Sequence, residues 1–282
     1  MKTVRICIHS LINAFKSTKG LVLLVIMLLY SYVFASPIAD MARLANLRLT
    51  PMIYPILLND KMGQLTFLSG YVLLLSVTMN TSLSDQALLP RVGYVAVAFE
   101  KVVYMVVLLV LYQIVFICFS QSLLLGITDW TLTWGEGWNL LCIEENWAGY
   151  HTVFFPNSFL ITEYSAVDAF SKTIVLESAL LLWIGLITET LRALFRPSVA
   201  VFSSMMISLS DIFFYNMMPI PLRILSPVSL AMLSTFQEPE VEAGITEDYA
   251  ICFYTITLIL LVAIHFIVQV IWRKKKRMGC VE

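Results

Sequence analysis

The residues of this chain that could do chemistry are acidic side chains placed inside long apolar segments. Glu177 and Asp211 are the clearest cases. If these segments cross a membrane, a charged group there is costly and usually faces the bundle interior, where it marks a path or a site for polar molecules. Glu177 lies about one turn into its segment, so the alternative is that it reaches the lipid headgroups. Both carboxylates are candidates for lining a translocation path.

Asp211 belongs to a polar stripe along one apolar segment. Polar residues recur there at spacings of four and three, which places them on a single helical face. The members are Ser204, Ser208, Asp211 and Tyr215, with Asn216 adjacent. The stripe predicts either the lining of a polar path or a helix–helix interface held by small polar side chains.

Other polar residues near the ends of apolar segments favour structural roles. Glu189 and Arg192 are three residues apart, which suits an ion pair on one helix, with lipid headgroups as the alternative partners. His265 has Gln269 about one turn further along its segment. We interpret this histidine as a packing residue rather than a proton relay.

Signatures of catalysis and of metal binding are absent from the sequence. It contains no P-loop, no H-E-x-x-H and no G-x-S-x-G motif. The five cysteines form no C-x-x-C pair and do not cluster with the three histidines, so neither a disulfide framework nor a zinc site is indicated. The chain is not expected to be an enzyme. Any ATP-driven work would need another subunit to bind and hydrolyse ATP.

Composition indicates that the elements positioning these residues lie in a membrane. The chain has 282 residues, of which 59% are hydrophobic and 13% charged, and its mean hydropathy is +0.85. Soluble domains carry about 25% charged residues. The net charge of -1 provides no basic excess for nucleic acid. These values indicate an integral membrane protein and exclude a soluble enzyme or a DNA-binding module.

Six apolar segments approach the length of about 20 residues that a membrane-spanning helix needs. They predict an all-α polytopic membrane protein with a single transmembrane domain, in which residues 20–272 form a six-span bundle. The segments are Gly20–Ile38, Leu65–Met79, Val102–Gly126, Thr173–Leu194, Val199–Met218 and Ala250–Trp272.

The distribution of basic residues sets the expected orientation. With a cytoplasmic N-terminus, thirteen Lys and Arg residues lie in inner segments and five in outer ones. Basic residues concentrate on the cytoplasmic side of membrane proteins. We therefore expect a multi-pass protein of the plasma membrane with both termini in the cytoplasm and a basic tail at residues 273–282.

Residues 1–19 carry apolar side chains on one helical face and basic side chains on the rest. This pattern predicts an amphipathic helix that lies in the cytoplasmic interface of the membrane. Two alternatives stay open. One is a disordered basic leader, and the other is a signal peptide with a cleavage site at Val33-Phe34-Ala35.

The inner loop from Asn80 to Lys101 mixes apolar and charged residues, and Pro90 can start a short helix within it. Such a helix would lie along the membrane, where it could dock a cytoplasmic partner. A plain interfacial connector is the alternative.

The fifth apolar segment ends at two prolines, Pro219 and Pro221, because each proline lacks the N–H donor that a helix needs. An apolar stretch follows at residues 222–233, and it contains Pro227. This stretch is too short to span the membrane. It predicts a re-entrant or interfacial element on the outer side.

A long outer connection at residues 127–172 is rich in tryptophan. Aromatic rings prefer the level of the lipid headgroups, so we expect a short amphipathic segment on the outer interface. A binding platform for lipid or peptide cargo is the alternative. The tryptophans are Trp130, Trp134, Trp138 and Trp147.

Together these features resemble the membrane (permease) subunit of a type 2 ABC exporter of the small Gram-positive kind. The similarity covers nearly the whole chain and consists of the amphipathic helix, the six spans, the segment between spans two and three, and the outer element between spans five and six. The matching positions are Arg5 to Phe15, Ser84 to Lys101 and Pro219 to Leu233. Within the inner loop, the stretches Arg91-Val92-Gly93-Tyr94 and Glu100-Lys101 are similar to the sequence that leads into span three of such permeases.

The resemblance implies a half-transporter that pairs with a second copy or with a sister permease, surrounded by membrane lipid. It also implies a separate ABC ATPase subunit on the cytoplasmic side, with ATP and Mg on that partner and no cofactor in this chain. The residues that would couple to the ATPase are Arg91, Gly93, Tyr94, Glu100 and Lys101.

Two functions of other classes stay open. A non-transporting assembly, immunity or sensory protein would use the Trp-rich outer connection to bind a peptide or a lipid. A secondary transporter would use Asp211 and Glu177 with an ion gradient, but six spans without an evident inverted repeat disfavour it.

Overall fold

The computed structural model describes residues 18–79, 93–143, 156–217, 224–237 and 245–272. Throughout these ranges the regular elements are helices, apart from a single parallel bridge between Leu49 and Thr128. The all-α class predicted from the sequence is confirmed for this part of the chain. The predicted N-terminal amphipathic helix, apart from its last residues, and the basic tail lie outside the described residues.

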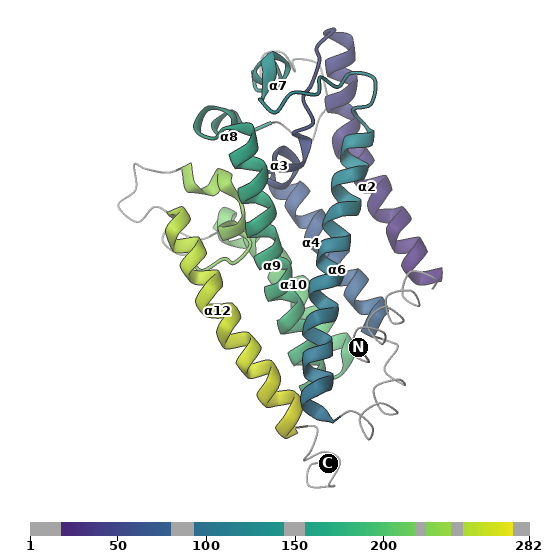
Figure 1. Cartoon of the computed structure of the whole chain (residues 1–282), viewed down its shortest axis with the longest axis vertical. Helices are drawn as coiled ribbons and strands as arrows, with labels where there is room; N and C mark the ends of the chain where they lie inside the picture. Colours follow the sequence, from purple (N-terminus) through teal and green to yellow (C-terminus); the bar gives the residue numbers. More distant parts are fainter. Residues whose placement is uncertain (1–17, 80–92, 144–155, 218–223, 238–244, 273–282) are drawn as a thin grey trace.

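Each of the six predicted apolar segments coincides largely with a helix (Figure 1). Among the described residues, three helices, α6, α9 and α12, are long and apolar enough to cross a membrane. The chain therefore has the character of a membrane protein. The six helices are α2 (Thr18–Leu44), α4 (Lys61–Met79), α6 (Tyr94–Ser122), α9 (Ala166–Leu194), α10 (Pro197–Met217) and α12 (Glu247–Ile267), the last continuing as the π-helical turn η4 (Val268–Trp272).

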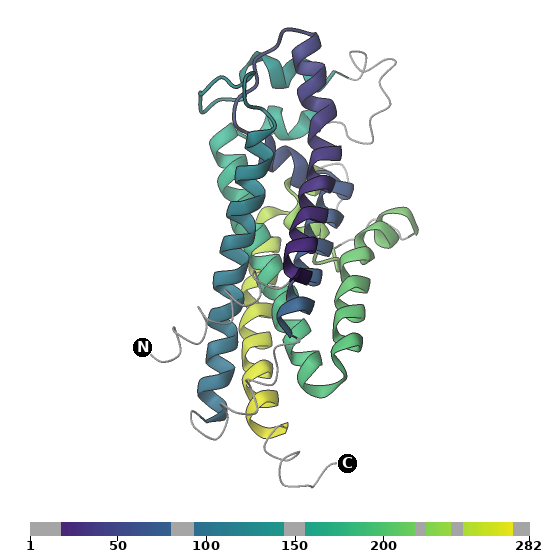
Figure 2. The same cartoon turned by 90° about the vertical axis from the view of Figure 1, so that its right-hand side faces the viewer.

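α9 is the central helix of the bundle. It packs against α12, α10, α6 and α4, whereas α2 packs against α4 and α6 (Figure 1, Figure 2). α9 and α10 form a tight hairpin through Phe195 and Arg196, because Pro197 suits the first turn of a new helix. We call this end of the bundle the hairpin end. The opposite end, where α7 (Gly135–Leu141) and α8 (Ser158–Glu163) lie, is the cap end.

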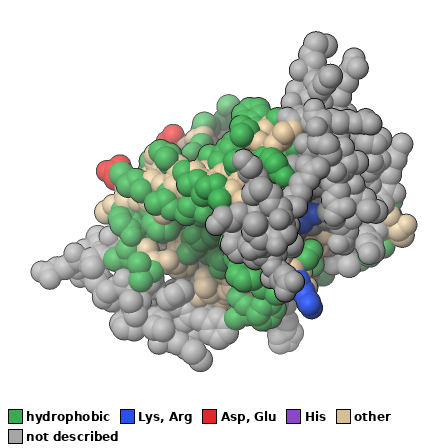
Figure 3. All heavy atoms as spheres, turned by 90° about the horizontal axis from the view of Figure 1, so that it is seen from below, with side chains coloured by type: hydrophobic (Ala, Val, Ile, Leu, Met, Phe, Trp, Pro, Cys, Tyr) green, Lys and Arg blue, Asp and Glu red, His purple; other side chains and the backbone are tan. Residues whose placement is uncertain are grey.

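The outward faces of α6 and α12 are apolar. Ile256 and Ile259 of α12 are 65% and 69% exposed, and Val110 and Ile114 of α6 are 45% and 50% exposed. Seen from the hairpin end, the described side chains are mainly hydrophobic, with some Lys or Arg and, at one edge, some Asp or Glu among them (Figure 3). Continuous apolar surface of this kind suits contact with lipid or with another membrane helix.

Two helices, α6 and α9, begin well before the apolar segments that predict them. α9 begins at Ala166, where the Ser165 hydroxyl caps it by accepting from the Asp168 N–H at 3.2 Å. α6 begins at Tyr94, directly after Gly93 at φ 86°, a conformation that glycine adopts without steric cost. Residues 94–101, which the sequence predicted to be inner loop, are therefore the first turns of α6.

The extended segment 45–52 crosses the cap end beneath α7. A Cβ atom at Gly137 of α7 would lie 2.3 Å from the carbonyl oxygen of Arg48, so only glycine permits this close approach. The Trp138 Nε1–H donates to the carbonyl of Thr50 at 3.1 Å. The cap is thus tied to the chain that leads from α2 into the bundle.

Two tryptophans of the outer connection are buried within the cap. Trp138 is 0% and Trp134 is 7% exposed, and the Trp134 Nε1–H donates to the Tyr164 carbonyl at 2.7 Å. The prediction that these two rings lie at the lipid headgroups is therefore wrong, because their N–H groups find carbonyl acceptors inside the protein. Trp130 is 74% exposed. Trp147 lies outside the described residues.

Residues 224–237, between α10 and α12, lie against α9 and α8. Asn59 holds this segment, since its Oδ1 accepts from the Ser234 N–H at 3.0 Å and its carbonyl accepts from the Ser234 hydroxyl at 2.9 Å. Asn59 itself follows a short helix whose residues are all buried. The elements joined in this way are α3 (Ile53–Leu58), η2 (Ser229–Ala231) and η3 (Leu233–Gln237).

Candidate functional site

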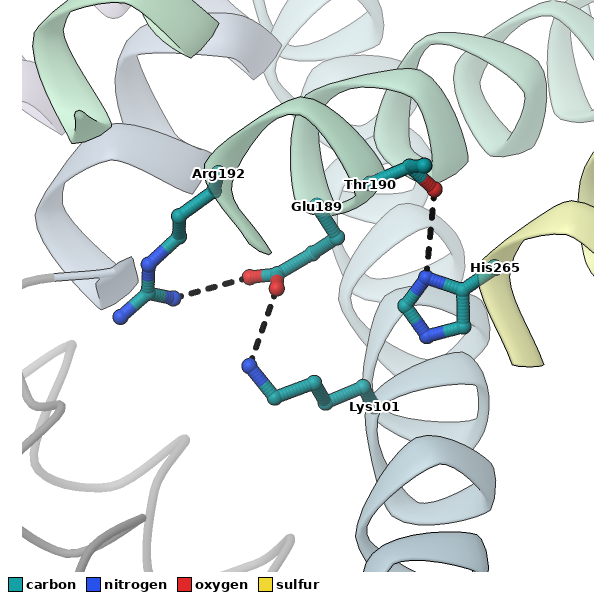
Figure 4. A network of polar contacts seen from close by, with 5 residues as sticks. All are labelled: Lys101, Glu189, Thr190, Arg192 and His265. Atoms are coloured by element: carbon teal, nitrogen blue, oxygen red, sulfur yellow. Dashed lines mark hydrogen bonds and ion pairs between the residues drawn. The ribbon is translucent and has the colours of Figure 1, made fainter. Parts of the chain in front are cut away.

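The strongest electrostatic feature of the described bundle is a buried cluster of three charged residues near the hairpin end, which we call the charge clamp. Lys101 of α6 lies with its Nζ 3.0 Å from Glu189 Oε2 of α9. Arg192 of α9 lies with its Nη1 3.0 Å from the other carboxylate oxygen, Oε1 (Figure 4). The three side chains are only 9–10% exposed. Both oxygens of Glu189 are therefore held by cations, one of them from another helix.

Polar contacts beside the clamp connect α9 to two more helices. The Thr190 hydroxyl lies 3.3 Å from Nδ1 of His265 on α12 (Figure 4). On the facing side, the hydroxyls of Thr188 and Ser204 lie 2.6 Å apart and join α9 to α10. All four side chains are buried. A displacement of α9 at this level would therefore disturb its contacts with α6, α10 and α12 together.

A second buried polar group lies higher on α9. Glu177 is 0% exposed, and so is Gln64 of α4. The Gln64 amide faces the Glu177 carboxyl, but no hydrogen bond of good geometry forms, and all four terminal atoms of the two side chains lack a hydrogen-bond partner among the described residues. The buried hydroxyl of Tyr54 on α3 also has none. Since the Glu177 side chain is completely buried, it faces the protein interior, and the alternative that it reaches the headgroups is wrong.

The structure separates the residues predicted to couple to an ATPase. Tyr94 and Glu100 are half-buried in the first turns of α6, and Gly93 immediately precedes them. Lys101 is buried and faces Glu189 of α9, so it is an internal clamp residue. Arg91 lies outside the described residues.

The predicted polar stripe is only partly described. Ser204 and Ser208 are buried, and their hydroxyls donate to the carbonyls of Ala200 and Ser204 within α10. They therefore lie at a helix interface. Asp211, Tyr215 and Asn216 also belong to α10, but their side chains lie outside the described part.

Only one of the three prolines of the predicted outer element lies in the described residues. Pro227 is buried, and its carbonyl accepts a hydrogen bond from the Tyr254 hydroxyl of α12. Pro219 and Pro221 lie outside the described residues.

Several residues of these sites were not recognised from the sequence. The Glu189–Arg192 pair was expected and is confirmed, but the third member, Lys101, lies 88 positions away along the chain. Gln64 and Tyr54 stand outside the predicted second span, and nothing local marks them as neighbours of Glu177. A glutamine one turn inside a long apolar helix, next to a lone carboxylate on another, is the signal that could have found this pair.

Comparisons with known proteins identify no relative. No protein-family model, curated protein or solved structure significantly matches the chain. In the described ranges, no group of three or more His, Cys, Asp or Glu side chains is placed to hold a metal ion. The function of the chain is therefore inferred from its own sequence and structure.

We predict that the Glu189→Gln variant unfolds at a markedly lower temperature than the wild type. Removing the carboxylate takes from two buried cations the anion that lies 3.0 Å from each of them, and breaking a buried ion pair in this way typically costs about 3–5 kcal/mol. The Asp40→Asn variant is the matched control, because Asp40 pairs with Arg43 at the same spacing but with 58% and 50% of the two side chains exposed, and should change stability by less than about 1 kcal/mol. Thermal unfolding of the purified proteins in detergent measures both. Equal small losses in the two variants would contradict the clamp.

Proposed function

We propose that this chain is the membrane-spanning permease subunit of an ATP-driven ABC exporter. In this proposal all six long helices cross the plasma membrane, the stretch at 219–233 is the outer re-entrant element, and two permease subunits together form the translocation path. A separate ATPase subunit binds at the cytoplasmic side, and that partner carries ATP and Mg. No nucleic acid takes part.

The observation that carries the proposal is the position of the charge clamp. Lys101 lies in the first turns of α6, shortly after the proposed coupling loop at residues 80–92, and its partner Glu189 lies on the central helix α9. Beside this pair, Thr190 contacts α12 and Thr188 contacts α10 through hydrogen bonds. A force applied by an ATPase to the loop would therefore reach three helices of the bundle through short buried contacts. Such coupling is what a permease without its own nucleotide site requires.

The orientation follows from the same end of the bundle. The hairpin end contains Arg192 and Arg196 together with the start of α6 and the end of α12, and the basic residues of the sequence concentrate in these inner segments. Since basic residues favour the cytoplasm, the hairpin end is the proposed cytoplasmic side. The cap end, with α7 and α8, is then extracellular.

A second candidate function is a non-transporting membrane protein that binds a peptide or a lipid at the cap end. Trp130 and Leu132 favour it, because they are 74% and 70% exposed on neighbouring positions of the cap. Contiguous exposed apolar patches mark interaction sites in proteins, and in this candidate these two side chains form part of one. This candidate needs no ATPase, so one experiment separates the two.

The topology predicts opposite labelling of two introduced cysteines in a cysteine-free background. Leu132→Cys at the cap end should react with a membrane-impermeant thiol reagent in intact cells, whereas Arg196→Cys at the hairpin end should react only after permeabilisation. The native Cys142 is unsuitable as the outer reporter, because burial raises its pKa to about 11 and leaves little reactive thiolate. Labelling of Arg196→Cys in intact cells would contradict the proposed orientation.

The exporter proposal predicts that an ATPase subunit copurifies with the tagged chain in mild detergent, as identified by mass spectrometry. Arg91→Glu in the coupling loop should reduce its recovery about tenfold, equivalent to about 1.4 kcal/mol of binding. Arg196→Glu is the control, since it reverses an exposed charge in the other inner connection and should leave recovery unchanged. If no P-loop ATPase copurifies with the wild type, the exporter proposal fails and the second candidate takes precedence.

A further inference from the structure

Glu177 is a fully buried acid that the clamp and the proposed coupling leave unexplained. Its carboxyl lies between α9 and α4, with Gln64 opposite, and its charge acts on the hydroxyls of Tyr54, Tyr112 and Tyr254. These groups come from α3, α4, α6 and α12. Buried aromatic and aliphatic side chains of the core surround them, together with the buried polar residues Gln113 and Thr173.

No basic side chain of the described residues acts on Glu177. The nearest cation along α9 is Lys172, which is paired with Glu247 of α12 at 2.7 Å. The next one along α9 is Arg192 of the clamp, which Glu189 already engages. Twelve residues of helix separate Glu177 from Glu189, a distance of about 18 Å. The clamp therefore cannot neutralise Glu177.

A buried carboxylate that faces no counter-charge is strongly unfavourable in an apolar interior, and a single neutral amide beside it does not balance its charge. Four oxygen atoms there lack hydrogen-bond partners among the described residues: the two of Glu177, Oε1 of Gln64 and the hydroxyl of Tyr54. Neutral amide and hydroxyl oxygens beside a carboxylate are hard ligands, which suit alkali-metal ions and protons rather than soft metals. One carboxylate balances one positive charge.

We infer that Glu177, with Gln64 and Tyr54, forms a binding site for a single monovalent cation in the core of the bundle. The cation is an alkali-metal ion held by these oxygens, or a proton on the Glu177 carboxyl shared with Gln64. Binding neutralises the site and stabilises the packing of α3 and α4 on α9. This site does not depend on the proposed function, because it requires only the packing of these helices.

The test is thermal unfolding of the purified full chain in detergent, followed by tryptophan fluorescence. Sodium, potassium and choline chloride are compared at equal ionic strength, and the pH is varied from mildly acidic to mildly alkaline. For an alkali ion, the wild type should melt about 3–6 °C higher at ten times the apparent dissociation constant than in choline. For a proton, its melting temperature should fall as pH rises, since the folded state then loses the bound proton. Glu177→Gln should abolish either response, because the amide is neutral without a cation.

Glu163→Gln, an exposed acid of α8, is the matched control and should respond like the wild type. If Glu177→Gln does not fold, two other measurements decide. Gln64→Leu should raise the half-saturating concentration of an alkali ion at least about tenfold. In the proton case, the wild type should instead show the infrared carbonyl band of a protonated carboxyl group.

Identical cation and pH responses of wild type and Glu177→Gln would overturn the inference, as would a wild type with neither a cation response nor the infrared band. The outcome is separable from that of the exporter proposal. A cation response can be present when no ATPase copurifies, and an ATPase can copurify when the response is missing.

Discussion

The constraint on which this structure depends is that α9 carries two carboxylates through the interior of an apolar bundle. In such surroundings a charge is tolerated only when a counter-charge or several hydrogen-bond donors face it. Glu189 meets this condition with Lys101 and Arg192 at 3.0 Å each. Glu177 does not meet it, because no cation of the described residues is bonded to its carboxylate oxygens. The charge of Glu189 is therefore balanced by the protein's own cations. The charge of Glu177, about three turns away on the same helix, is the one for which we propose a bound cation.

The arrangement of the other helices follows from this difference between the two acids. α6 contributes Lys101 to the charge clamp, while α12 and α10 contribute His265 and Ser204 beside it. The apolar sides of α6 and α12 then remain on the outside, where isoleucine and valine are open to lipid or to a second membrane subunit. At the cap end the protein relies instead on indole and hydroxyl contacts to backbone carbonyls, as Trp138 shows with Thr50.

Much of the fold could be predicted from the sequence, because long apolar runs determine where helices lie. The pairing of Glu189 with Arg192 could also be read, since helical periodicity alone brings residues three apart together. The contacts between residues far apart in the sequence could not be predicted. Lys101 is predicted to couple to the ATPase because its stretch resembles the sequence that leads into span three of such permeases, whereas α6 already begins at Tyr94 and Lys101 is buried against Glu189. Trp134 and Trp138 were misplaced for a similar reason, since an indole suits both a lipid headgroup and a buried carbonyl.

The central claim is that Lys101 and Glu189 form one energetic unit that ties α6 to α9, since the proposed path of coupling from the inner loop passes through this pair. A double-mutant cycle with Lys101→Met, Glu189→Met and the combined variant tests it directly by thermal unfolding in detergent. The account predicts strong coupling, with the combined variant more stable than the sum of the single losses implies by at least about 1 kcal/mol. Additive losses would show that the two residues act independently and would contradict the clamp.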